Sequence, residues 1–189
     1  MKLLLPLLLG AAAAAVRIAV DMVGEGSINK KTALSRVDAN SLNQLLHSAI
    51  DVSEPLNIIA VGLAASPGAA VGKVVFTADD AVAQAEAGQP VILVRQETSP
   101  EDILGMNVAQ GILTARGGLT SHAAVVARQM GKCCITGCST IDVQVDKKIL
   151  ETNDHTIMEG DWISLNGNSG EVILGEANTM QPETVSYTH

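Results

Sequence analysis

GGLTSHAAVVAR, at residues 117–128, sets the architecture that we predict for this chain. An apolar run at 111–115, typical of a strand, precedes it, and an amphipathic run typical of a helix begins within it. Gly117 and Gly118 let the backbone turn sharply between the two elements. Open α/β sheets bind ligands at the carboxyl ends of their strands, so this turn is predicted to face a ligand.

His122 is the residue of this turn that carries chemical interest. The side chain of Thr120 or Ser121 can cap the first helical turn, which leaves His122 near the helix N-terminus. Free amide groups and the positive end of the helix dipole favour negative charge there. A neutral imidazole can attack phosphorus and pass the group on, which splits one hard transfer into two. From spacing alone, this role and that of a purely structural helix cap are equally good interpretations.

Composition limits the class of protein. The chain has 189 residues, of which 47% are hydrophobic and 17% are charged, enough for one domain with a real core and a lead-in. Phe, Trp and Tyr occur once each, so aliphatic residues must build that core. The net charge of −8 disfavours nucleic acid as a partner, because affinity for its backbone comes from Lys and Arg.

No nucleotide-binding motif is complete. Residues 68–74, GAAVGKV, have three residues between the glycines where a phosphate-binding loop has four, and a valine where the magnesium-binding hydroxyl is needed. His47, His155 and His189 are interpreted as a helix-end, a solvated-loop and a tail residue. His122 would therefore be a carrier whose donor and acceptor sites lie elsewhere.

The cysteines and the N-terminus bear on the compartment. Cys133, Cys134 and Cys138 form a poor disulfide framework and lack the fourth ligand of a zinc site, so we predict buried, reduced thiols and no metal site. Residues 1–14 have the form of a signal peptide. Reduced thiols do not suit a secreted protein. They agree better with three other interpretations of residues 1–14: an extension, a mis-called start or the beginning of the first helix. We expect a cytoplasmic protein and leave residues 1–14 as an unassigned extension.

The rest of the chain divides by pattern. Residues 15–55 have helical periodicity with caps at Asn29 and Asp38, which predicts a short helical lead-in. Residues 56–177 alternate strands and helices between hairpins, which predicts a mixed α/β domain. Residues 178–189 read as a polar tail. The expected strands are 57–61, 72–76, 90–94, 111–115, 133–136, 163–165 and 172–174. The expected helices are 15–23, 30–36, 40–47, one capped by Thr77, one beginning at Ser99–Pro100 and one from His122 to Gly131.

At 117–128 the residues resemble the phosphohistidine signature of the phosphoenolpyruvate-utilising enzymes. The glycine pair, Thr120, His122, the small and aliphatic residues after it and Arg128 agree in register, and Leu119 departs from the methionine of many members. Further stretches are similar to the branch that makes phosphoenolpyruvate from ATP, phosphate and pyruvate, and the similarity covers most of the chain. These stretches are about 16–47, 65–72, 97–102, 131–134 with 137–138, and 164–167 with 170–175.

The resemblance implies an α/β fold, a swivelling β/β/α phosphohistidine domain preceded by the helical lead-in. It implies that His122 takes a phosphoryl group derived from ATP at an ATP-grasp nucleotide-binding domain and delivers it at a barrel domain to pyruvate. Gly117, Gly118 and Ser121 would form the supporting loop. Neither partner domain is recognisable in this chain, so we expect a piece of a larger enzyme that does not turn over alone.

The resemblance also implies regulation at Thr120, the position that a kinase and a phosphatase modify in plant members. A second dianion there would repel a phosphoryl group arriving at His122. Mg²⁺ is expected for the full enzyme but not in this domain, the full enzyme would be a homodimer, and in a plant the compartment would be the chloroplast stroma. Two alternatives stay open: a non-catalytic regulatory or interaction module of the same fold, and an enzyme I-like carrier of a sugar phosphotransferase system.

Overall fold

The computed structural model describes residues 15–37, 47–53 and 55–180. Contacts divide the chain into two units, Met1–Ser48 with Gln181–His189, and Ala49–Met180. In the first unit, residues 15–24 are helical and α2 (Lys30–Arg36) follows. Both helices were predicted, and the remaining predicted helix, 40–47, lies almost wholly outside the described residues, as does the extension at 1–14.

Local capping explains α2. The Asn29 side chain accepts a hydrogen bond from the Thr32 amide at 2.8 Å, which satisfies one of the free donors at the helix start. Gly26 adopts a φ of +71°, a conformation that suits glycine, in the turn after the first helix. No helix among the described residues is long and apolar enough to cross a membrane.

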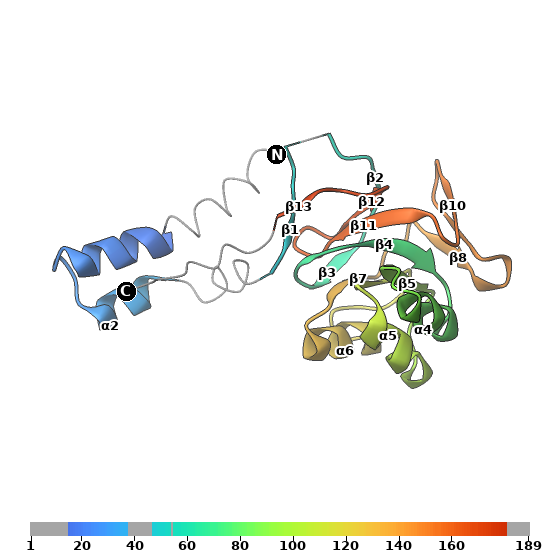
Figure 1. The fold of residues 1–189 in the computed structure, drawn as a ribbon, viewed down its shortest axis with the longest axis horizontal. Coiled ribbons are helices and arrows are strands. Elements are labelled where there is room, and N and C mark those ends of the chain that lie inside the picture. Colours follow the sequence, from blue (N-terminus) through green and yellow to red (C-terminus); the bar gives the residue numbers. More distant parts are fainter. Residues whose placement is uncertain (1–14, 38–46, 54, 181–189) are drawn as a thin grey trace. The chain divides into compact units, whose positions relative to one another are not determined.

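The second unit is a mixed α/β structure, which confirms the predicted fold class, and each predicted strand overlaps an observed one (Figure 1). Its strands are β1 (Ala49–Ile50), β2 (Ile58–Val61), β3 (Leu63–Ser66), β4 (Ala69–Val75), β5 (Val91–Arg95), β6 (Gly111–Thr114), β7 (Cys133–Thr136), β8 (Asp142–Gln144), β9 (Ile149–Glu151), β10 (Thr156–Met158), β11 (Trp162–Asn166), β12 (Glu171–Leu174) and β13 (Thr179–Met180). Its helices are α4 (Ala78–Glu86), α5 (Ile103–Val108) and α6 (His122–Met130), with 3-10 turns at Pro100–Asp102 and Val145–Lys147.

The main sheet has the order β2-β12-β11-β4-β5-β6-β7-β3. Strands β4 to β7 run parallel, and the other pairs are antiparallel. β2 and β3 end up at opposite edges although only Gly62 separates them, so the sheet must curl until its edges approach. A Cβ on Gly62 would lie 2.7 Å from Ile135 Cγ2 and 2.9 Å from the Thr136 carbonyl, which is why glycine occupies this junction.

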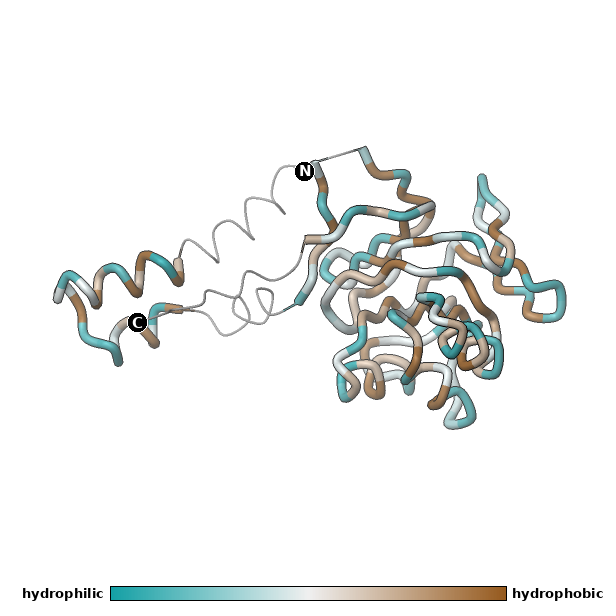
Figure 2. The backbone as a smooth tube through the Cα atoms, in the orientation of Figure 1, coloured by the Kyte–Doolittle hydropathy of each residue, from teal (hydrophilic) through white to brown (hydrophobic). Residues whose placement is uncertain are grey.

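The sheet is buried on both faces. Ile92 and Val94 of β5 belong to the core enclosed by the curled sheet, whereas Val91 and Leu93 point to the other face. On that face α4, α5 and α6 cover the parallel strands (Figure 1). In Figure 2 the apolar colour follows the strands and the polar colour marks the tips of the peripheral loops. Because both faces of such a parallel sheet are covered, the sequences of its strands are almost continuously apolar.

Two small sheets were not predicted. The sheet β10-β9-β8 contributes one buried side chain from each strand, namely Val143, Leu150 and Ile157. The other pairs β1 with β13, Ala49 opposite Met180. The compact unit therefore begins before residue 56 and ends after residue 177.

Candidate functional site

The turn after β6 is held in shape by hydrogen bonds and by glycine. The Thr114 hydroxyl donates to the Arg116 carbonyl at 2.7 Å, and Gly117 follows with a φ of +110°. Gly137, with a φ of +61°, lies against this turn, and a Cβ there would come within 2.5 Å of the Gly117 carbonyl oxygen. Two glycines thus allow the turns after β6 and β7 to pack directly against each other.

Ser121 caps α6, and His122 is the first helical residue. The Ser121 side chain accepts a hydrogen bond from the Ala124 amide at 3.4 Å. Of the two predicted caps the structure uses Ser121, and Thr120 is exposed. Gly131 ends the helix in the left-handed conformation, as predicted. His122 is half-buried, and Leu119 and Thr120 of the neighbouring turn are exposed.

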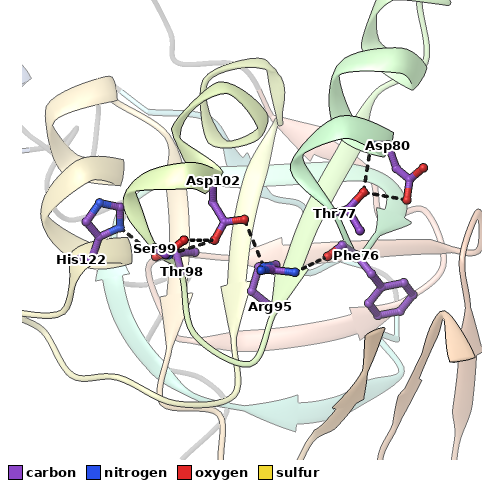
Figure 3. A network of polar contacts seen from close by, with 8 residues as sticks. All are labelled: Phe76, Thr77, Asp80, Arg95, Thr98, Ser99, Asp102 and His122. Carbon is purple, nitrogen blue, oxygen red and sulfur yellow. Dashed lines mark hydrogen bonds and ion pairs between the residues drawn. The ribbon is translucent and has the colours of Figure 1, made fainter. Parts of the chain in front are cut away.

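Thr98 orients the His122 ring. Its Oγ1 lies 3.1 Å from His122 Nδ1, and Thr98 itself is only 9% exposed (Figure 3). This partner was missed by sequence reasoning, which treated residues 97–102 as a helix start and a point of family resemblance. Nothing local in the sequence links the two residues, because the contact depends on how the loop after β5 packs on the turn after β6.

Asp102 holds the segment that follows Thr98. Its Oδ2 accepts hydrogen bonds from the Ser99 amide at 2.9 Å and the Ser99 hydroxyl at 3.3 Å, which confirms the predicted cap. Its Oδ1 lies 3.2 Å from Arg95 Nε, and the other end of that guanidinium donates to the Phe76 carbonyl at 2.9 Å (Figure 3). Oδ2 of this buried carboxylate is thus hydrogen-bonded, and Oδ1 is in ion-pair contact with Arg95 Nε, a nitrogen that makes no hydrogen bond.

Arg128 fastens the turn to the sheet edge. Its Nε donates to the Ala65 carbonyl of β3 at 2.8 Å, and its terminal nitrogen donates to the Leu119 carbonyl. The arginine of the signature thus has a structural task, because it connects the last turn of α6 with the loop that precedes its first turn.

The stretch that resembles a nucleotide-binding loop has another role. Residues 69–75 form strand β4, so the backbone amides that would cradle a phosphate are paired within the sheet. The adjoining Gly68 carbonyl accepts a hydrogen bond from the Gly167 amide at 2.8 Å. Ser66 pairs with Cys134 near the beginning of β7, whereas Leu63 pairs with Thr136 at its end. The loop at 66–68 therefore lies at the end of β7 opposite to the His122 turn.

The thiols are buried and free, as predicted. Burial raises the pKa of Cys133 to about 12, and burial together with the neighbouring Cys133 raises the pKa of Cys134 to about 12. Near neutral pH both thiols therefore stay protonated in the folded protein, which disfavours them as nucleophiles. Within the part of the chain that the structure describes, no group of three or more His, Cys, Asp and Glu side chains is placed to hold a metal ion. His155 closes the β9–β10 turn, where its amide donates to Thr152 Oγ1 at 3.0 Å.

Comparison with known proteins shows a similarity to one family over the region that contains the candidate site. Residues 87–170 match the family described as PEP-utilising enzyme, mobile domain, and this segment contains Thr98, the glycine turn and all of α6. The resemblance of the sequence to the phosphoenolpyruvate-utilising enzymes is thus confirmed.

The relatives to which the chain is similar are named pyruvate, phosphate dikinases. The chloroplastic enzyme of Flaveria pringlei is 58% identical over 164 residues, which are 86% of this chain and 17% of the relative. Pyruvate, phosphate dikinase 2 of Oryza sativa subsp. japonica is 56% identical over 170 residues, 89% of this chain and 19% of the relative. The chloroplastic dikinase 1 of Arabidopsis thaliana is 57% identical over 170 residues, 89% of this chain and 18% of the relative. The chain spans less than a fifth of these relatives.

Proposed function

We propose that this domain is a phosphoryl carrier of a pyruvate phosphate dikinase and that His122 is the residue that carries the group. The observation that supports this most directly is the position of His122 Nδ1, 3.1 Å from the Thr98 hydroxyl, on the first residue of a helix. A purely structural helix cap would not need its ring held by a nearly buried threonine on another loop. His122 is only partly buried, as a residue that receives a group from another domain has to be.

Thr98 selects the nitrogen that reacts. When Nδ1–H donates to the Thr98 hydroxyl oxygen, the lone pair of the neutral ring lies on Nε2. That lone pair attacks phosphorus, an N–P bond forms, and the P–O bond of the donor breaks with its electrons on the leaving oxygen. The proton on Nδ1 stays in place while the ring acquires positive charge. The hydrogen bond to Thr98 therefore strengthens as the reaction proceeds, which is the condition for catalysis.

The start of α6 also suits a phosphoryl group. The first turn of a helix presents free amide groups and the positive end of the dipole, and both favour an anion. Gly118 and Leu119 lie before the cap, and a Cβ on Gly118 would meet no heavy atom within 4 Å among the described residues. The turn thus leaves space for a donor or an acceptor that arrives from another domain.

We place the donor and acceptor sites in other domains of the full enzyme. An ATP-grasp nucleotide-binding domain would load His122 with a phosphoryl group from ATP, and a barrel domain would receive it for transfer to pyruvate, giving phosphoenolpyruvate. The domain would swivel between them, and the full enzyme would be a homodimer. Mg²⁺ is expected for the full enzyme, and among the described residues no group of three or more His, Cys, Asp and Glu side chains is placed to hold a metal ion.

Thr120 is proposed as the regulatory site. It is exposed on the turn, two residues before His122, where a kinase or a phosphatase can reach its hydroxyl. A phosphate there adds nearly two negative charges beside the imidazole and opposes the approach of a second phosphoryl group.

For the full protein we propose the chloroplast stroma as the compartment. Relatives from Flaveria pringlei and Arabidopsis thaliana are named chloroplastic, which supports the chloroplast stroma over the cytoplasm for the full protein. Carriage to a sugar-transport protein, as by enzyme I, has less support because the relatives named above are dikinases.

Mass spectrometry of the loaded chain tests the carrier role. The 189-residue chain is incubated with the separate ATP-binding domain of a plant dikinase, ATP, phosphate and Mg²⁺, and the intact mass is measured. We expect one added phosphoryl group that is stable in base and lost in acid. His122→Asn should abolish the addition, and His155→Asn, a change in a turn between two short strands, should not. Labelling of the His122→Asn variant at the parent rate would refute the role, and an unlabelled parent would favour a non-catalytic module.

A further inference from the structure

We propose that Asp102, fastened by Arg95, is the positioning residue that aims the Thr98 hydroxyl at His122. The consequence for phosphoryl transfer rests on the proposed function of His122, whereas the effect on the imidazole ring does not. The carboxylate contacts neither the ring nor the reacting atoms. It acts through the loop that connects β5 to the 3-10 turn (Figure 3).

The loop that carries Thr98 has no regular structure and needs an anchor on each side. On the far side, Ser99 and Asp102 are joined by two hydrogen bonds: the Asp102 amide donates to the Ser99 carbonyl at 3.0 Å, and the Ser99 amide donates to Asp102 Oδ2 at 2.9 Å. This pair fixes the residue immediately after Thr98. On the near side, Arg95 is the last residue of β5 and is fixed by the sheet.

The ion pair joins these two anchors. Arg95 Nε lies 3.2 Å from Asp102 Oδ1, and the Asp102 side chain is 5% exposed against 25% for Arg95. A carboxylate this deeply buried costs free energy unless it is paired and hydrogen-bonded. The pair therefore restrains the loop between Arg95 and Asp102. The second bond of Arg95, to the Phe76 carbonyl, sets the guanidinium against the end of β4. The loop is thus closed across its base.

The Arg95–Asp102 pair matters because the hydrogen bond between Thr98 and His122 tolerates little movement. A hydroxyl and a ring nitrogen at 3.1 Å are within hydrogen-bond range, and a displacement of about 1 Å removes the bond. Without that bond the ring is free to change tautomer or to rotate, and the lone pair leaves Nε2 for part of the time. Asp102 therefore decides indirectly which nitrogen is available.

Nitrogen NMR of the neutral His122 ring is the primary test, because it needs no phosphate. In the parent chain we expect the proton on Nδ1. Thr98→Val should lower the ratio of the Nδ1–H to the Nε2–H form by about five- to tenfold, the effect of one ordinary hydrogen bond. Asp102→Ala should produce a similar drop. Asp102 acts through Thr98 in this proposal, so the double variant should be no worse than Thr98→Val alone.

A chemical donor gives the second readout. Phosphoramidate can transfer its phosphoryl group to imidazole as its P–N bond breaks and ammonia leaves, and phosphorus NMR distinguishes the two ring positions. The parent should be modified on Nε2, and Asp102→Ala should lose this preference together with Thr98→Val. Glu101→Ala is the matched control, because it removes an exposed acid from the same 3-10 turn and should change neither readout.

The outcomes separate this proposal from the carrier role. An unchanged tautomer ratio in Asp102→Ala, beside a changed ratio in Thr98→Val, would overturn it, as would additive effects or an unaffected Thr98→Val. If Asp102→Ala does not fold, Arg95→Gln is measured in its place and should lower the tautomer ratio. Arg95→Lys keeps the positive charge and should restore the parent ratio. A ratio as low in Arg95→Lys as in Arg95→Gln would indicate a merely structural role for Arg95. If the unchanged chain is never phosphorylated by the ATP-binding domain, the carrier role is wrong. The tautomer ratio would still decide the role of Asp102.

Discussion

Thr98 Oγ1 lies 3.1 Å from His122 Nδ1, although the two residues are 24 positions apart in the chain. The hydroxyl comes from the loop after β5 and the imidazole from the helix after β6, two neighbouring parallel strands. Because parallel strands bring their carboxyl ends to the same edge of a sheet, the two loops meet there. In the proposed carrier role, this contact selects which nitrogen of the His122 ring is free to react.

Thr98→Val should slow the loading of His122 from the ATP-binding domain by about tenfold or less, because one hydrogen bond of about 1 kcal/mol is lost. Val has nearly the shape of Thr, so packing changes little. Thr98→Ser keeps the hydroxyl and should load at close to the parent rate. The initial rate of phosphoryl incorporation is the measurement. Equal rates for the Val and Ser variants would show that the hydroxyl plays no part.

Gly117→Ala should destabilise the fold by about 1–3 kcal/mol, since an L-residue at a φ of +110° is strained. Its Cβ would also lie 3.0 Å from the Cβ and Oγ of Ser121, the residue that caps α6. Urea unfolding curves measure the change. Gly118→Ala is the control: it has no positive φ and an open surrounding, and it should cost far less. Equal midpoints for the two variants would contradict the strain at residue 117.

Thr120→Glu should reduce loading of His122 by adding negative charge beside the ring, and Thr120→Val should leave loading intact while removing the site for a kinase. The hydroxyl of Thr120 is exposed and Ser121 supplies the cap, so the Val variant should also unfold at the parent temperature. Loading rate and thermal unfolding are measured side by side. Loss of loading in the Val variant would give the hydroxyl a catalytic or structural part.

Stability should fall as the pH rises from about 9 towards about 12, because burial raises the pKa of Cys133 and Cys134 to about 12 from an ordinary value of 9.0. The unfolded thiols ionise first, so the stabilisation is complete below about pH 9 and is lost as the pH approaches the folded-state value. Urea unfolding at a series of alkaline pH values measures this. Cys133→Ala should flatten the slope.

The same burial predicts the reactivity of the thiols. In the native protein at about pH 8 they should react with a disulfide reagent far more slowly than after unfolding in guanidinium. Rapid native reaction would show that the β7 thiols are accessible, and would undermine the alkaline prediction as well.

Caps and turns were predicted well because their chemistry is local. Asn29, Thr77 and Ser121 each accept a hydrogen bond from an amide three residues further on, a spacing visible in the sequence. The sheet β8–β10 escaped notice because each strand has three residues and a single buried one, too short for a clear alternation. The polar stretch around His155, interpreted as a solvated loop, is the tight turn of that sheet.

The local chemistry of residues 117–128 determines a strand end, a glycine turn and a capped helix with His122 at its start, because each step depends on neighbours within about one helical turn. Only the tertiary structure decides which groups meet that histidine. The curl of the sheet at Gly62, the contact of Thr98 with His122, and the pairing of Arg95 with Asp102 all require strands distant in sequence to pack side by side. Packing of that kind leaves no periodic trace in the amino-acid order.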